Sequence, residues 1–457
     1  MSTLIRGGTV IVGDGVVAPR DAAVVIRDGV IAEVVDQWDS SRGFDGEVID
    51  ATGCVVMPGL INSHTHGVTP GPFMPSAASG LDHQTWMANL DRHLLAGTTT
   101  VLSQCGFSTM EDVAVADRAH AVHVKGATTL LPQAIEAARQ ADGTGLGRES
   151  ALSTIERELE AGAIAIGELG GGQTLGGGGQ DLVYIPDALE QRTGVRVTAT
   201  QARELKDAAL GRFLDVGNGD PAALVQAVEN AGLANVISLD QLRELIVKTV
   251  MPSVNPAIEG IREGVRAAAR FGVPAIVHSA SATSAVMAEL LGRFSATEVK
   301  VVAAHSNHPS HTPAEALAAA TAWRTHGWAI EVSVFDLLHR KHTVSTREHW
   351  DVLLSEPGLV DVLATDYGSK GKHDELISAV QDVSTHGYRS LAGAVAMATS
   401  AVSDLIPGIA PRRGRLEHGW AADVVVADSA DFRLVRHVLV DEIVVVRDGS
   451  LTAEAHR

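Results

Sequence analysis

The sequence predicts an α/β protein, in which a (β/α)8 TIM barrel is joined to a small β-sandwich domain built from both chain termini. Apolar runs of strand length alternate with Ala-rich helical stretches, eight such strands can be counted, and both termini are rich in β-branched residues. Alternating strands and helices are typical of a parallel sheet covered by helices. A count of eight favours a closed barrel over an open sheet.

The two ends of the chain resemble each other in composition. Residues 1–57 contain TLIRGGTVIV and AAVVIRDGVIAEVV, broken by Gly and Asp, and residues 408–457 contain ADVVVAD and EIVVVRDG. Short runs of this kind indicate β-strands. We therefore expect residues 1–57 and 408–457 to form one composite β-sandwich domain, and residues 58–407 to form the barrel.

Several of the predicted barrel strands end at residues whose side chains can bind a metal ion. Their ends lie near His66, Gln104, Gln133, Glu168, His278, His305, Val334 and Asp366. In a (β/α)8 barrel these ends meet at one mouth, where active sites lie. Polar residues are common wherever a strand returns to solvent, but five of these eight residues are metal-ligand types. The set therefore predicts an active site.

Residues 173–254, after the fourth predicted strand, exceed the usual length of a barrel connection. They begin Gly-rich and continue with helical stretches such as ATQARELKDAAL, before a barrel helix expected to begin at residue 255. We expect a mostly helical insertion near the mouth. A surface decoration that supports an oligomer interface is the alternative.

Charge and composition narrow the class of protein. The 457 residues carry a formal charge of −19 and include only two cysteines. Nucleic-acid binding depends on clustered Lys and Arg, so the charge argues against it. Two cysteines favour a reducing compartment, and the N-terminal segment lacks the apolar core of a signal peptide. We expect a cytoplasmic protein with no membrane span, acting on a small molecule and forming a homo-oligomer.

Four histidines and two carboxylates make up the predicted metal centre. His64 and His66 are two residues apart, so on an extended strand both rings point to one side. His278 and His305 each follow a buried apolar strand, and four imidazoles suit zinc and similar divalent ions.

The two carboxylates of the predicted centre have separate roles. Glu168 can bridge two ions with its two oxygens, and Asp366 can bind one and take a proton from its water. A rim ion pair for Glu168 and a helix N-cap for Asp366 are the alternatives. We expect two divalent ions. Zinc is the first expectation, and iron, manganese and cobalt are the alternatives. A site with a single ion is also an alternative.

Loops after other strands supply candidate substrate contacts. The residues are Gln104, Cys105, His308, His311, Tyr367, Lys370 and Lys372. The lysines could meet a substrate carboxylate, although a solvated basic loop is the simpler interpretation. Packing is the simpler role for Cys105.

In their order along the chain, these motifs resemble the amidohydrolase superfamily. Its pattern is His-x-His after the first barrel strand, Lys or Glu after the fourth, His after the fifth and sixth, and Asp after the eighth. Many members carry a carbamylated Lys after strand four, where this chain has Glu168. The strings GELGGG, AIEVSV and ATDYGSKG most resemble enamidase, and adenine deaminase and N-acetylglucosamine-6-phosphate deacetylase are more distant Glu-type relatives.

The ligands and the resemblance imply a metal-dependent amidohydrolase that acts on non-peptide C–N bonds. A metal-bound hydroxide would attack an amide, lactam or cyclic amide, and Asp366 would carry the proton to the leaving nitrogen. The alternatives are a deaminase of a nitrogen heterocycle and a non-catalytic binding paralogue.

Overall fold

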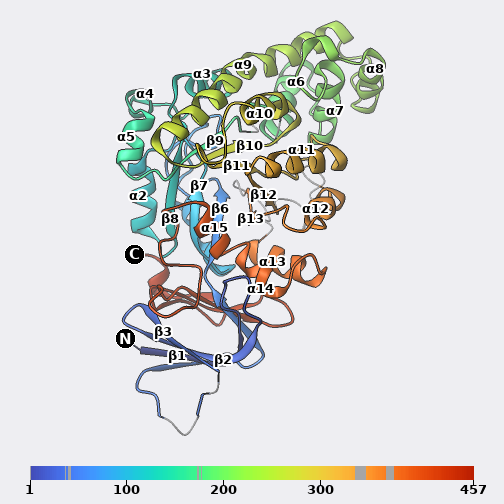
Figure 1. Ribbon diagram of the computed structural model, residues 1–457. Helices are drawn as coiled ribbons and strands as arrows, with labels where there is room; N and C mark the ends of the chain where they lie inside the picture. The colour runs from blue at the N-terminus through green and yellow to red at the C-terminus, as the bar shows by residue number, and fades with distance from the viewer. Residues whose placement is uncertain are drawn as a thin grey trace.

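The computed structural model describes residues 2–36, 38–39, 43–171, 174–176, 178–334, 346–366 and 375–457. Its centre is a barrel of eight parallel strands (Figure 1). These are β6 (Leu60–Thr65), β7 (Thr98–Ser103), β8 (His123–Thr128), β9 (Ala165–Leu169), β10 (Ala275–His278), β11 (Val301–Ala304), β12 (Ala329–Ser333) and β13 (Val362–Ala364). The first and last strands meet where the Asp366 N–H donates to the His64 carbonyl at 3.0 Å, so the predicted barrel is confirmed.

Helices surround the barrel and close its lower end. They are α1 (His83–Leu95), α2 (Met110–Ala119), α3 (Pro132–Ala141), α4 (Arg148–Leu152), α5 (Ile155–Glu160), α9 (Leu239–Phe271), α10 (Ser284–Leu291), α11 (Pro313–Thr325), α12 (Arg347–Leu354), α13 (Leu376–Thr385), α14 (Leu391–Ala396) and α15 (Ser400–Leu405). Inward-facing apolar residues such as Ile61, Ile276 and Val302 pack with Val402 of α15 and with Ile406. This part of the barrel is therefore a packed apolar core.

Both termini contribute to the second sheet, which lies below the barrel in Figure 1. Its nine strands are β1 (Ser2–Val10), β2 (Arg20–Arg27), β3 (Val30–Val35), β4 (Glu47–Asp50), β5 (Cys54–Pro58), β14 (Val424–Asp428), β15 (Val435–Val440), β16 (Ile443–Arg447) and β17 (Ser450–Leu451). β5 pairs with β14, and residues from both ends, including Ile26 and Val424, share one core. The division of the chain at residues 57 and 408 stays a prediction.

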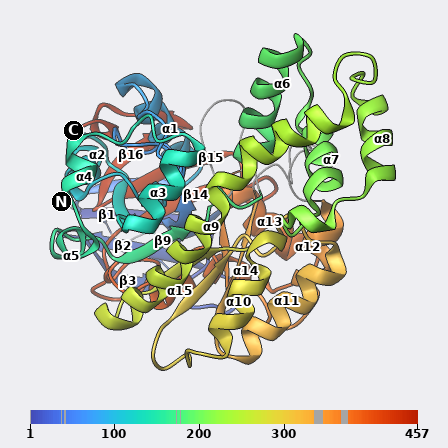
Figure 2. The same ribbon diagram turned by 90° about the horizontal axis from the view of Figure 1, so that it is seen from above.

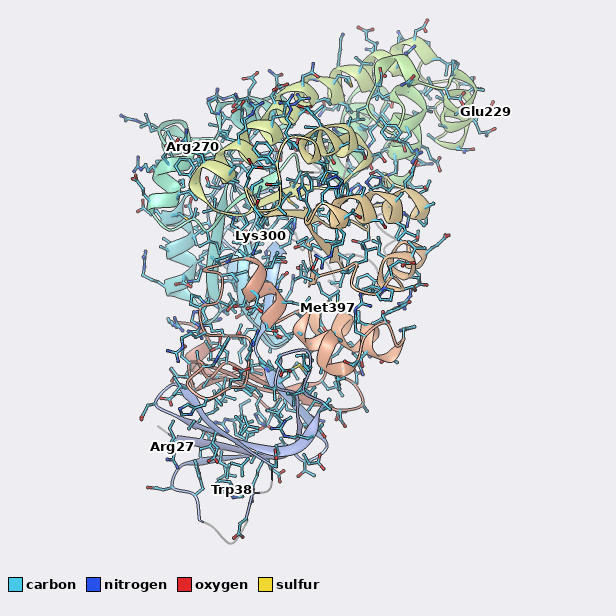
Figure 3. The ribbon with its side chains drawn as sticks, in the orientation of Figure 1. Arg27, Trp38, Glu229, Arg270, Lys300 and Met397 are labelled. Atoms are coloured by element: carbon cyan, nitrogen blue, oxygen red, sulfur yellow. The ribbon has the colours of Figure 1, made fainter. Side chains whose placement is uncertain are left out.

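The segment between β9 and α9 is helical and projects to one side of the barrel (Figure 2). It contains η1 (Gln180–Tyr184), α6 (Ile185–Thr193), α7 (Ala199–Leu210), η2 (Val216–Asn218) and α8 (Pro221–Asn230). In Figure 3, Glu229 of α8 and Arg270 of α9 lie at opposite edges of the molecule. α9 lies along this side of the molecule, and its 33 residues, at about 1.5 Å each, give a helix of roughly 50 Å.

Two boundaries differ from the sequence prediction. The barrel helix expected to begin at residue 255 is the second half of α9, which runs unbroken through Pro252 and Pro256. Packing of its apolar face outweighs the cost of the two prolines. The third strand ends at Thr128, and Gln133 lies in α3, because Pro132 takes the first helical position, which favours proline.

Across the described residues, none of the helices has the length and apolar character that crossing a bilayer requires.

Candidate metal centre

The six predicted ligands lie together at the barrel mouth. Five are almost fully buried, and the Asp366 side chain is 26% exposed. They converge from the ends of five strands: β6 (His64, His66), β9 (Glu168), β10 (His278), β11 (His305) and β13 (Asp366). Thr65 points the other way and contacts His93 at 3.2 Å, as the alternation of a strand requires.

His64 and His66 form one half of the centre. The Nε2 of His64 lies 3.7 Å from Oε2 of Glu168 and 3.5 Å from Oδ1 of Asp366. The Nε2 of His66 lies 3.6 Å and 3.5 Å from the same two oxygens. All four distances exceed those of good hydrogen bonds.

His278 and His305 form the other half. The Nδ1 of His278 and the Nε2 of His305 each lie 2.8 Å from Oε1 of Glu168, and 3.1 Å from each other. The two oxygens of Glu168 therefore face different histidine pairs. Oε2 faces His64 and His66, and Oε1 faces His278 and His305.

These spacings fit atoms that share divalent ions. Zinc binds His nitrogen and carboxylate oxygen at about 2.1 Å, so two ligands lie about 3.0 Å apart at a right angle and about 3.4 Å apart in a tetrahedron. Among the described residues, the buried Nε2 of His64, which faces Glu168 and Asp366, has no hydrogen-bond partner. Buried ring nitrogens rarely stay unpaired, so the donor set suits a cation.

The ionised carboxylates of the site also favour a bound cation. Burial alone would raise the pKa of Glu168, but hydrogen bonds with His278 and His305, and the nearby His64, hold it well below its usual range. Burial likewise opposes a charge on His66, yet Asp366 and Cys105 raise its pKa to about 9. Ionised carboxylates thus attract positive charge into the mouth, and a divalent ion can supply it in place of protons.

The backbone is unusual at two of the candidate ligands. His305 has φ +34° and Asp366 has φ +50°, a region that non-glycine residues seldom adopt. Such conformations persist where the surrounding structure holds them, often at functional sites. Asp366 is held by its N–H bond to His64, which joins the first and last barrel strands at the metal centre.

Glu331 in β12 is a functional residue that the sequence prediction missed. It is fully buried, and its Oε1 lies 3.0 Å from Nδ1 of His64 while its Oε2 accepts a hydrogen bond from Ser63 Oγ at 2.6 Å. A carboxylate behind a ligand histidine fixes the ring orientation. The available signal was a lone acidic residue inside the apolar strand AIEVS, because a buried charge needs a partner.

Two of the predicted substrate residues, Gln104 and Cys105, lie behind the ligands. The Gln104 side chain is fully buried and donates to the Ser63 carbonyl at 3.1 Å. The sulfur of Cys105 lies 3.5 Å from Nδ1 of His66. These contacts are with the strand that carries His64 and His66, and a role of Gln104 and Cys105 in substrate binding stays a prediction.

His308 and His311 lie beside the centre. The His308 ring centroid is 5.1 Å from that of His278, and its Nδ1 contacts Ser310 Oγ at 2.8 Å. The buried Nε2 of His311 has no hydrogen-bond partner among the described residues. The other predicted contacts, Tyr367, Lys370 and Lys372, lie outside the described residues.

Comparison with known proteins gives partial sequence matches. No family model matches the chain. A dihydroorotase from Halalkalibacterium halodurans is 30% identical over 174 residues, which cover 38% of this chain and 36% of that protein. A D-hydantoinase from Geobacillus stearothermophilus is 42% identical over 66 residues (14% and 13%), and a dihydropyrimidinase from Rattus norvegicus is 37% identical over 103 (22% and 18%). The chain thus spans well under two thirds of these relatives' length.

Solved structures match over almost the whole chain. A β-aspartyl dipeptidase from Fervidobacterium islandicum has a TM-score of 0.57 with 14% identity, covering 99% of this chain and 98% of its own. A D-hydantoinase has a TM-score of 0.54 with 16% identity, covering 100% and 97%. Together with the sequence matches, these similarities indicate the amidohydrolase superfamily. Within it, the sequence matches reported above are to proteins named for cyclic amides.

Proposed function

We propose that this protein is a metal-dependent hydrolase that opens cyclic amides by cleaving a ring C–N bond. The observation that carries the proposal is the convergence of four histidines and two carboxylates at the barrel mouth, where the buried Nε2 of His64 faces both carboxylates and has no hydrogen-bond partner among the described residues. The dihydroorotase, D-hydantoinase and dihydropyrimidinase matches support a cyclic amide as the substrate class.

The donor set supports two divalent ions bridged by Glu168. His64 and His66 would hold one ion and His278 and His305 the other, with Asp366 on the first; zinc suits these nitrogen and oxygen donors best. When bound, such ions lower the pKa of water to about 7 and polarise a carbonyl. A single ion bound by His64, His66 and Asp366 is the alternative.

Asp366 is the residue placed to move protons. It is the most exposed of the six ligands, and its Oδ1 faces both ligand histidines of β6. Burial would raise its pKa, but His66 and the neighbouring imidazoles lower it, so the carboxylate is ionised and able to accept a proton. We assign Asp366 to take a proton from the attacking water and to deliver it to the leaving nitrogen.

A deaminase of a nitrogen heterocycle is the second candidate. One sequence match is a 5-methylthioadenosine/S-adenosylhomocysteine deaminase from Desulforamulus reducens, 38% identical over 87 residues. The resemblance of GELGGG to enamidase concerns the same Glu168 and also favours ring opening. Matches named for cyclic amides are more numerous, so we place ring opening first.

The test is a substrate panel read in two ways. Purified protein with added zinc or manganese is incubated with dihydrouracil, hydantoin, dihydroorotate, a simple lactam and adenine-type heterocycles. Ring opening is followed by loss of ultraviolet absorbance, and ammonia by a coupled assay. We expect ring opening without ammonia, abolished by chelator and restored by metal. Ammonia from the heterocycles alone would favour the deaminase, and no turnover of any compound would overturn the proposal.

A further inference from the structure

His308 lies beside the metal centre but is not one of the six candidate ligands. Its ring centroid is 5.1 Å from that of His278 and 5.6 Å from that of His305, and the residue is only 7% exposed. Its side-chain hydrogen bonds to described residues are made by Nδ1. Its Nε2 has no hydrogen-bond partner among those residues and is not enclosed by them. The ring therefore has one free nitrogen next to the His278 and His305 pair.

The hydrogen bonds of His308 fix the position of its ring proton. The Ser310 N–H donates to Nδ1 of His308 at 3.2 Å, and Ser310 Oγ lies 2.8 Å from the same atom. Because a backbone N–H can only donate, Nδ1 is an acceptor and carries no proton. The ring is therefore neutral, with its proton on Nε2.

His64 has the opposite arrangement. Its Nδ1 lies 3.0 Å from Oε1 of the buried Glu331, which suits a proton on Nδ1. Its Nε2 then has no proton and faces Glu168 and Asp366. A ring nitrogen without a proton can bind a metal ion, whereas an Nε2–H group can only donate a hydrogen bond. His308 therefore presents a donor beside the centre and does not suit the role of a seventh ligand.

Ser310 is held in place from two sides. Ser281, which follows β10, donates its N–H to Ser310 Oγ at 2.9 Å and its hydroxyl to the Ser310 carbonyl at 2.6 Å. Arg212 of the helical insertion donates to the same carbonyl at 3.2 Å. Arg212 also binds the carboxylate of Glu315 in α11 through two nitrogens, at 2.7 and 2.9 Å. The insertion thus helps to fix the segment that carries His308.

We propose that His308 donates its Nε2–H to the carbonyl oxygen of the amide that is cleaved, and that Arg212 of the insertion positions it. An amide has one good acceptor, its carbonyl oxygen, so this is the group that a fixed N–H donor can bind. As the oxygen of the attacking water bonds to the carbonyl carbon, the π electrons of the C=O bond move to the carbonyl oxygen, and the donor then binds it more strongly. This inference rests on the proposed ring-opening function and adds to it a catalytic residue and a role for the insertion.

The first test replaces the donor. His308→Leu should lower kcat about 10²- to 10³-fold on the ring that wild type opens fastest, with metal content unchanged because His308 is not a ligand. His308→Gln carries an amide N–H on a side chain of similar reach and should recover at least about tenfold of that loss. Wild-type kcat in His308→Leu, loss of its metal, or a His308→Gln variant no faster than His308→Leu would each overturn the role of the donor.

The second test is a double-mutant cycle. Arg212→Ala should lower kcat about tenfold in wild type and no further in His308→Leu, because the arginine acts through that ring. Arg196→Ala is the matched control and should keep the wild-type kcat, because Arg196 also pairs with two carboxylates, Asp187 and Glu190, but both lie within the insertion. Equal losses from Arg212→Ala in both backgrounds would overturn the positioning role.

A third measurement needs no activity and separates the two proposals. In zinc-loaded protein with ¹⁵N-labelled histidine, the nuclear magnetic resonance signals that disappear in His308→Gln identify the ring of His308. We expect an unprotonated Nδ1 and a protonated Nε2. A proton on Nδ1 would overturn this inference and leave ring opening standing. A wild-type protein that opens none of the rings would overturn both.

Discussion

Two of the clusters of histidine and carboxylate among the described residues, one at the mouth and one at the base of the barrel, differ in whether their ring nitrogens have hydrogen-bond partners. The lower cluster is Asp91, His120 and His456, where Oδ1 of Asp91 lies 3.1 Å from His120 Nε2 and 2.7 Å from His456 Nε2. Its distances are as short as those at the mouth. However, the Val122 N–H donates to His120 Nδ1, so the proton of the neutral ring lies on Nε2 and points at Asp91.

The comparison shows that proximity alone does not define a metal site. In the lower cluster, hydrogen bonds to Asp91 account for both Nε2 atoms, and the cluster ties the chain end to α1 and α2. At the mouth, the buried Nε2 of His64 has no hydrogen-bond partner among the described residues, and the spacings on the His64 and His66 side exceed hydrogen-bond length. We therefore expect catalysis at the mouth and a structural role for the Asp91 cluster, in line with other barrels.

The largest effect is expected from Glu168→Gln. The substitution keeps the side-chain size but removes the charge that faces both histidine pairs. We expect bound metal to fall below one equivalent and ring opening to fall at least about a thousandfold. Metal analysis and steady-state kinetics measure this, and a variant with full metal content and activity would rule out the bridge.

Asp366→Asn separates proton transfer from metal binding. The amide cannot accept the proton, so kcat should fall roughly 10²- to 10⁴-fold. Metal content should fall less than in Glu168→Gln, because Asp366 faces only His64 and His66 whereas Glu168 faces both histidine pairs. Near-normal kcat with metal retained would contradict the role given to Asp366.

Glu331→Gln tests the orienting residue behind His64. Removing its charge should weaken metal binding about 10- to 100-fold, and kcat in saturating metal should recover most of its value. Competition with a chromogenic chelator measures the affinity. Unchanged affinity would show that Glu331 only fills space in the barrel.

The smallest effect is expected at the base. Asp91→Asn weakens contacts that are partly exposed, so the loss of stability should stay below about 1 kcal/mol, with metal content and kcat unchanged. Chemical denaturation and metal analysis check this. If Asp91→Asn lost as much metal as Glu168→Gln, the conclusion that the Asp91 cluster does not contribute to metal binding would be wrong.

The sequence was most informative where a physical rule connects pattern to position. Alternating strands and helices predicted the barrel, and strand ends predicted that His64, Glu168 and Asp366, far apart in the chain, would meet. It was least informative where packing decides. The length of α9 through Pro252, and the role of Glu331 inside a strand, depend on partners that no local pattern reveals.

The most direct test of the account is the position of metal in the molecule. Crystals grown with zinc, with data collected on both sides of its absorption edge, should show anomalous peaks on either side of the Glu168 carboxylate. One peak should adjoin His64 and His66 and the other His278 and His305, with none beside Asp91. An active crystal with no peak at the mouth would contradict the central claim.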